Sequence, residues 1–140
     1  MKRYLILLFA LFTILQANAQ EKRTTIVFEK TTINLGKIEQ DNPVRDCFFV
    51  FKNTGDKKLY IHQVRPSCGC TSKRFPTRGI EPGASDTIFI TYNGSGKSPQ
   101  KFRTTISVHS NGTPELTTLA LRGEMLPAKV KETPVIEIEE

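Results

Sequence analysis

The sequence predicts an all-β fold, an immunoglobulin-like β-sandwich of about seven strands with Greek-key connections that follows a cleaved N-terminal signal peptide. Apolar and polar residues alternate along most of the chain, as they do in half-buried strands, and helical 3.6-residue spacing is nowhere sustained. Turn-forming residues separate the alternating segments at short intervals, as in sandwich domains of about 100 residues. A closed β-barrel is the alternative, because its strands would alternate in the same way.

Each alternating segment is expected to form one strand, and the first of them an edge strand. In chain order, their apolar residues are Ile26 and Phe28; Ile33 and Leu35; Cys47, Phe49 and Phe51; Leu59 and Ile61; Ile88, Ile90 and Tyr92; Phe102, Ile106 and Val108; and Leu119 and Leu121.

The segments between these strands contain residues that favour turns for a physical reason. Asn93-Gly94 and Asn111-Gly112 can adopt a positive φ at low cost, and Glu81-Pro82-Gly83 is a further turn. Prolines at positions 43, 82, 99 and 114 lack the N–H group that a central strand needs.

The first nineteen residues have the three parts of a secretory signal peptide. Lys2 and Arg3 supply positive charge, Tyr4–Leu15 is almost wholly apolar, and Ala17-Asn18-Ala19 is a small-x-small cleavage site. The apolar run is shorter than the roughly 20 residues that a transmembrane helix needs. We therefore expect residues 1–19 to be removed and the mature protein, starting at Gln20, to be periplasmic or secreted.

Residues 20–126 are expected to form one domain, and residues 127–140 a C-terminal tail that contains Pro127 and Pro134. The alternative for the tail is a strand at residues 135–138 that pairs with a sheet edge, its own or a partner's.

Several functional classes are disfavoured by composition and by missing motifs. Loss of Lys2 and Arg3 leaves 18 basic and 14 acidic residues, a scattered net charge of +4 that does not suggest nucleic acid. The chain has no phosphate-binding glycine loop, no His-Glu-x-x-His motif and no Gly-x-Ser-x-Gly motif. With only two histidines, it has few candidates for a general base, so we do not expect an enzyme or a cofactor.

Five sequence blocks in this order and spacing resemble a known family. They are Phe49–Asp56 (FVFKNTGD), Leu59-x-Ile61, Pro66–Thr71 (PSCGCT), Ile80-x-Pro82-Gly83 and Ser110-Asn111. Together they resemble the domain of unknown function 1573 from about Phe28 to Gly123. The resemblance implies an immunoglobulin-like sandwich, related to hydin-like and major-sperm-protein-like modules, in exported proteins of Gram-negative bacteria such as the Bacteroidota. It implies no activity, and it says nothing about Cys47.

Three cysteines cannot all pair within one chain, so at least one is free, buried or intermolecular. Cys47 shares a strand face with Phe49 and is expected to be a small core residue. Cys68 and Cys70 fall in a loop. A Cys68–Cys70 disulfide would stabilise the fold by about 1.5 kcal/mol through chain entropy, and a Cys47–Cys68 disulfide by about 3.4 kcal/mol.

The Cys-Gly-Cys loop is the candidate site, and its chemistry stays open between three interpretations. Ser67, Gly69 and Thr71 support the loop, and Gly69 would permit a tight bridge. The simplest interpretation is a turn or local bridge with no chemistry. Nearby cations lower a thiol's pKa and favour a redox role; they are Arg65, Lys73, Arg74 and Arg78. A Cu(I) site would need His62 or His109 as an added ligand.

The function most consistent with the sequence is that of an exported, non-enzymatic module that presents loops or a strand edge to a protein or cell-envelope partner. The alternative is a thiol-redox or copper-handling protein centred on Cys68 and Cys70.

Overall fold

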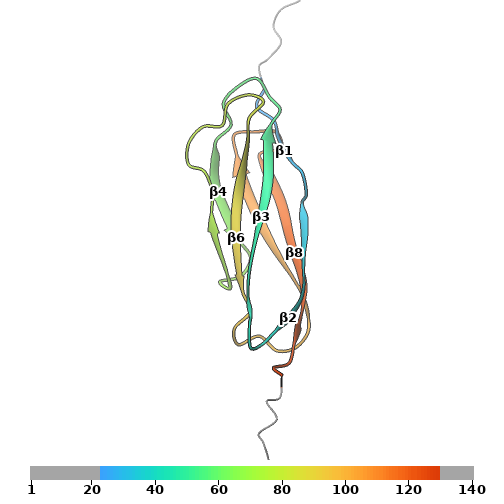
Figure 1. Cartoon of the computed structure of the whole chain (residues 1–140). Helices are drawn as coiled ribbons and strands as arrows, with labels where there is room; N and C mark the ends of the chain where they lie inside the picture. Colours follow the sequence, from blue (N-terminus) through green and yellow to red (C-terminus); the bar gives the residue numbers. More distant parts are fainter. Residues whose placement is uncertain (1–22, 130–140) are drawn as a thin grey trace, which may run out of the picture.

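The computed structural model describes residues 23–129 and forms a sandwich of two four-stranded sheets (Figure 1). The first sheet has the order β1 (Ile26–Phe28), β3 (Val44–Asn53), β6 (Ser85–Asn93) and β5 (Thr71–Arg74). The second has the order β2 (Thr32–Glu39), β8 (Leu116–Leu126), β7 (Lys101–Ser110) and β4 (Ile61–Pro66). The predicted all-β, immunoglobulin-like sandwich is confirmed, whereas the predicted signal peptide lies outside the described residues.

One of the eight described strands was not expected from the sequence. Strand β5 reads Thr-Ser-Lys-Arg, and of these four residues only Thr71 is buried, so it lacks an apolar alternation. It forms nonetheless because it lies at a sheet edge and needs to pair only with β6. Leu59 also differs from expectation: it forms an isolated bridge with Ile80, and β4 begins two residues later at Ile61.

The core lies between the sheets. Most of its side chains are among the predicted alternating apolar residues, but Ile38, Val64, Ile80 and Met125 were not predicted, and Ile33 and Leu35 are only partly buried. Phe49, Phe51, Ile88 and Ile90 face inward from the first sheet, and Ile106, Val108, Leu119 and Leu121 face inward from the second. Tyr92 of β6 stacks on Phe102 of β7 with ring centroids 4.5 Å apart, which joins the two sheets at one end of the core.

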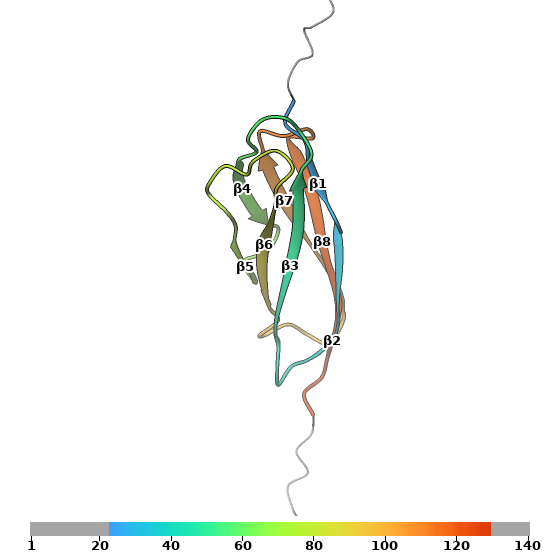
Figure 2. The same cartoon turned by 45° about the horizontal axis from the view of Figure 1, so that its top comes forward.

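The two long sides of the sandwich are closed differently. On one side the N-terminal segment changes sheets, because β1 pairs with β3 and β2 then runs parallel to β8. The β2–β8 register shifts between Asn34 and Lys37, where Gly36 adopts a φ of +72° and its N–H donates to Asn34 Oδ1. On the other side β4 and β5 lie next to each other (Figure 2), joined by the segment that contains Cys68 and Cys70.

The predicted role of two turn glycines was wrong. Gly94 and Gly112 have no positive φ; the glycines that do are Gly36, Gly83 and Gly96. Gly94 and Gly112 are both buried. An added Cβ would lie 2.8 Å from Met125 Sδ at Gly94 and 3.0 Å from Leu59 Cδ1 at Gly112. Gly94 and Gly112 are therefore required for close packing. Of the three predicted turns, Glu81-Pro82-Gly83 is the one whose glycine has a positive φ.

The described start of the C-terminal tail is held against the β2–β3 turn. The Ala128 N–H donates to Gln40 Oε1 at 3.2 Å, and the Lys129 N–H donates to Asp41 Oδ2 at 2.9 Å. Lys129 Nζ also lies 3.0 Å from Glu39 Oε1. The alternative of a strand at residues 135–138 lies outside the described residues. Within residues 23–129, no helix is long and apolar enough to cross a membrane.

Candidate functional sites

An aromatic pair projects from the outer surface of the first sheet. Side chains alternate along β3, so Phe49 points into the core and Phe48 points outward, where it is 60% exposed. Phe89 faces outward from β6 in register with Phe48 and is 44% exposed. The two ring centroids are 6.5 Å apart at an interplanar angle of 49°. Val50 extends this apolar surface along β3, and Val44 lies further along the same face, beyond Asp46.

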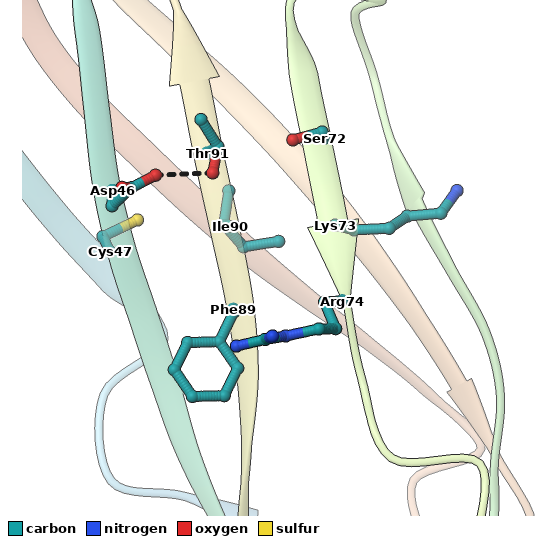
Figure 3. Close-up of a pocket in the computed structure, with 8 residues that line it drawn as sticks. All are labelled: Asp46, Cys47, Ser72, Lys73, Arg74, Phe89, Ile90 and Thr91. Carbon is teal, nitrogen blue, oxygen red and sulfur yellow. Dashed lines mark hydrogen bonds between the residues drawn. The ribbon is translucent and has the colours of Figure 1, made fainter.

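Arg74 completes the surface from the neighbouring edge strand. It is in register with Phe89, and its guanidinium carbon lies 4.6 Å from the centroid of the Phe89 ring. Figure 3 shows Arg74 extending toward Phe89 while Lys73 extends away from it. Among the described residues, no carboxylate pairs with Arg74. We refer to Val44, Phe48, Val50, Phe89 and Arg74 as the aromatic face.

The aromatic face lies between two hollows. One, of about 260 Å³, is lined by residues that include Ser72, Arg74 and Phe89. The other, of about 320 Å³, is lined by residues that include Lys30 and Phe48. Beside the first, Thr91 Oγ1 donates to Asp46 Oδ1, drawn as a dashed line in Figure 3, so this carboxylate is engaged within its own sheet. The surface can therefore take up apolar side chains and offers a cation next to them.

Cys47 is free and packs against the core, but it is half-buried rather than fully buried. It contributes to both hollows beside the aromatic face. Burial first, and the nearby Asp46 carboxylate second, raise the pKa of the Cys47 thiol from 9.0 to about 11. A neutral thiol is a poor nucleophile, so Cys47 is expected to be unreactive at physiological pH.

Cys68 and Cys70 form a disulfide with a Cα–Cα distance of 5.3 Å, so the longer Cys47–Cys68 pairing does not occur. We call residues 67–71, which carry this disulfide from β4 to β5, the cysteine turn. Ser67 anchors its start to β7: the Ser67 N–H donates to Thr105 O, and the Thr105 N–H donates to Ser67 Oγ. A Cβ on Gly69 would meet nothing within 4 Å, and Gly69 has no positive φ, so the tight bridge does not depend on a glycine there.

A pocket of about 210 Å³ opens beside the disulfide, and its cations are not those expected from the sequence. Lys97 and Arg103 line it together with Cys68 and Cys70. Of the expected cations, Arg74 lies over Phe89 and Arg78 pairs with Asp86 at 2.6 Å, and neither Arg65 nor Lys73 lines this pocket. Lys97 and Arg103 are distant from the cysteines in the sequence and come close to them through the pairing of β4 with β7 and of β5 with β6.

The histidines considered as metal ligands, His62 and His109, are both exposed on strands of the second sheet. Within residues 23–129, no group of three or more His, Cys, Asp and Glu side chains is placed to hold a metal ion. The structure therefore brings the two cysteines together but does not assemble the copper site that the sequence left open.

Some of the residues that carry the family resemblance hold the fold together. Asn53 is fully buried, and its Nδ2 donates to the carbonyl oxygens of Lys57 and Ile80. Asn111 holds the segment before β4 in a similar way: the Tyr60 N–H donates to Asn111 Oδ1, and Asn111 Nδ2 donates to Lys58 O. These two blocks fix the loops at one end of the sandwich, so they specify the fold rather than a site.

Comparisons with solved structures agree on the fold. The chain is similar to a protein of unknown function from Porphyromonas gingivalis W83, with 18% identity and a TM-score of 0.63, covering 78% of this chain and 50% of that one. It is also similar to PapD-like domain 7 of human CEP192, with 11% identity and a TM-score of 0.61, covering 81% and 93%. The Pseudomonas aeruginosa CupB2 chaperone has 13% identity and a TM-score of 0.52, covering 76% and 57%. At these identities the likeness shows the fold alone.

This chain spans half the length of the P. gingivalis protein. No curated protein matches the sequence. The model of the family described as "Protein of unknown function (DUF1573)" matches residues 26–125, nearly the whole sandwich. The resemblance seen in the sequence blocks is thereby confirmed, and the chain belongs to the DUF1573 family.

Proposed function

We propose that this protein is an exported, non-enzymatic binding module whose aromatic face contacts a protein partner in the periplasm or outside the cell. The observation that carries the proposal is the exposed pair Phe48 and Phe89 with the Arg74 guanidinium over it. Single exposed apolar residues are ordinary on protein surfaces. A contiguous group of aromatic residues and an arginine has instead the composition of an interface core.

The aromatic face is favoured over the edges formed by β4 and β5 as the contact surface. Edge strand β5 is short and carries Lys73 and Arg74, and edge strand β4 ends at Pro66. Charged side chains and proline are the usual means by which an edge strand avoids pairing with another chain. We therefore propose a contact through a sheet face, whereas the loop or edge contact expected from the sequence stays a prediction.

The partner that fits this surface presents an apolar side chain next to a carboxylate. The two phenylalanines would bury the apolar group, and Arg74 has no acidic partner among residues 23–129. The guanidinium lies over the Phe89 ring, and this contact would restrict the side chain before it binds a carboxylate. The net charge of +4 that remains without Lys2 and Arg3 would also attract an acidic partner over longer distances.

The export half of the proposal rests on the signal-peptide pattern in residues 1–19. N-terminal sequencing of the protein from a periplasmic or culture fraction tests it. The expected first residue is Gln20, and a protein that keeps residues 1–19 in the cytoplasmic fraction would contradict export.

The binding half is tested by site-specific photo-crosslinking in the producing cells. A photoreactive phenylalanine analogue replaces Phe48 or Phe89 in turn, and a matched control places it at Leu116, which is 51% exposed on β8 of the other sheet. We expect positions 48 and 89 to give the same crosslinked protein, and position 116 to give none of it.

Arg74 variants then test the chemistry of the contact. Arg74→Glu should abolish the crosslink from position 48, whereas Arg74→Lys should keep a reduced crosslink because the charge remains. Equal crosslinking from positions 48, 89 and 116, or a crosslink that Arg74→Glu does not change, would contradict the proposed surface.

A further inference from the structure

The disulfide of the cysteine turn lies at the edge of the core: Cys70 packs against core side chains, and a pocket is open beside both cysteines. Cys68 and Cys70 are each half-buried, and both line the pocket of about 210 Å³ that also contains Lys97 and Arg103. The two cations are exposed and hold positive charge beside the sulfur atoms. The pocket gives a small thiol or an exposed cysteine of another protein a way to approach the disulfide, and its charge attracts the thiolate form.

Two buried threonines place hydroxyl groups at the disulfide, and they do so unequally. Thr71 Oγ1 lies 3.5 Å from Cys68 Sγ and 3.9 Å from Cys70 Sγ. Thr104 Oγ1 lies 3.9 Å from Cys68 Sγ. Thr71 is 8% exposed, and Thr104, which also lines the pocket, is 6% exposed.

The hydroxyls would interact more strongly with a thiolate than with the disulfide. A sulfur in a disulfide is a weak acceptor, whereas a negatively charged sulfur accepts strongly from O–H donors. Because Cys68 has two hydroxyls close to it and Cys70 has one at longer distance, negative charge is better stabilised on Cys68.

We propose that the Cys68–Cys70 disulfide is an exchange site that accepts two electrons from a dithiol, with Cys70 as the attacked sulfur and Cys68 as the leaving thiolate. This function is separate from the protein-binding role of the aromatic face. Thr71 and Thr104 act as positioning residues that stabilise the leaving thiolate. A disulfide that closes so short a loop stabilises the folded protein only weakly, which is consistent with an exchangeable bond.

In the first step, one thiolate of the dithiol attacks Cys70 Sγ. A bond forms between the two sulfur atoms, the Cys68–Cys70 bond breaks, and its electron pair remains on Cys68 Sγ as a thiolate. In the second step, the other thiolate of the dithiol attacks its own partner sulfur and releases Cys70 as a thiolate. The dithiol leaves as a disulfide, and the two protons that it gave up are taken by Cys68 and Cys70.

The Ser67 hydrogen bonds to Thr105 hold the start of the turn on β7, so the reduced thiols should stay close enough to pair again. Cys47 should not interfere, because burial and Asp46 hold the pKa of its thiol at about 11.

The test uses the Cys47→Ser protein and reduced glutathione as the probe, because a monothiol stops the reaction at the mixed disulfide. After quenching with N-ethylmaleimide, peptide mass mapping locates each group. We expect glutathione on Cys70 and N-ethylmaleimide on Cys68. Glutathione mainly on Cys68, or no mixed disulfide at millimolar glutathione, would overturn the proposal. With dithiothreitol instead, one oxidised dithiothreitol should form per protein reduced.

The role of the hydroxyls is tested separately. In a Cys47→Ser, Cys70→Ser protein, the pH dependence of alkylation by iodoacetamide gives the pKa of the Cys68 thiol. Thr104→Val should raise this pKa by about one unit and, in the disulfide form, slow exchange about threefold. Thr104→Ser should restore both values because it keeps a hydroxyl, and Thr87→Val on the outer face of β6 should change neither. If Thr104→Val and Thr104→Ser give the same pKa and rate as threonine, the hydroxyl has no such role.

Discussion

The Arg74 guanidinium lies 4.6 Å from the centroid of the Phe89 ring, and this contact joins edge strand β5 to the exposed surface of its neighbour β6. Arg74 follows the cysteine turn by only a few residues, so β5 connects both candidate sites. At its start, Thr71 contacts the disulfide, and at its end, Arg74 completes the aromatic face.

Replacing Arg74 with alanine should change binding much more than stability. An exposed cation–π contact contributes about 0.5–1 kcal/mol, so Arg74→Ala should lower the free energy of unfolding by no more than about 1 kcal/mol. Urea denaturation followed by circular dichroism measures this. A decrease in the free energy of unfolding above about 3 kcal/mol would mean that Arg74 holds β5 in place. The effect of Arg74 variants on crosslinking would then reflect misfolding rather than a lost contact.

Two glycines within the sequence blocks that resemble the family should differ in how much stability an alanine costs. A Cβ at Gly55 would overlap the backbone of Arg23, Thr24 and Thr25, which cannot move as a side chain can. Gly55→Ala should therefore lower the free energy of unfolding by about 3 kcal/mol. Gly69→Ala meets nothing within 4 Å and should stay within about 0.5 kcal/mol of wild type. Equal effects in thermal denaturation would contradict the packing described here.

Loss of the disulfide should destabilise the protein less than loss of one core ring. The bridge spans a sequence separation of 2, so chain entropy predicts that Cys68→Ser with Cys70→Ser costs about 1.5 kcal/mol. Phe49 is 1% exposed, and Phe49→Ala should cost about 3–5 kcal/mol. Chemical denaturation of both variants gives the comparison. If removal of the disulfide lowered the free energy of unfolding more than Phe49→Ala does, the cysteine turn would have a mainly structural role.

Cys47 should make stability fall at alkaline pH. Below pH 9 its thiol is neutral in both folded and unfolded protein. As the pH rises from about 9 to 11, the unfolded chain ionises while the folded thiol resists, so the free energy of unfolding decreases. The free energy of unfolding of Cys47→Ser should depend less on pH over this window than that of wild type. Burial also raises the pKa of the Tyr92 hydroxyl, but this affects both proteins equally. Identical pH profiles for the two proteins would contradict the raised pKa.

Alternation was sufficient to predict the fold because most strands pack one face on the core. The inward positions of β3, β6, β7 and β8 follow directly from it. Strand β5 could not be predicted in this way, because its pairing with β6 depends on backbone hydrogen bonds and its outward side chains are polar. Gly94 and Gly112 were misinterpreted because their constraint comes from residues distant in the chain, Met125 and Leu59.

The candidate sites were predicted only in part. The Cys68–Cys70 pair is local, so the sequence could propose it, but Lys97, Arg103 and Thr104 reach it through the pairing of β4 with β7 and of β5 with β6. The aromatic face was missed because alternation placed Phe49 on the inward side of β3 but gave no reason to single out Phe48, whose neighbour Phe89 is set by the β3–β6 register. Arg74 joins it through the unexpected strand.

The most direct test of the binding role is the affinity of the purified, crosslink-identified partner for four versions of the protein, measured by isothermal titration calorimetry. The four are wild type, Phe48→Ala with Phe89→Ala, Arg74→Glu, and Leu116→Ala as the matched control. Interface hot-spot residues contribute about 2 kcal/mol or more each, so both aromatic-face variants should bind at least ~30-fold more weakly, while Leu116→Ala binds like wild type. Equal affinity for all four proteins would contradict the assignment of the aromatic face as the binding surface.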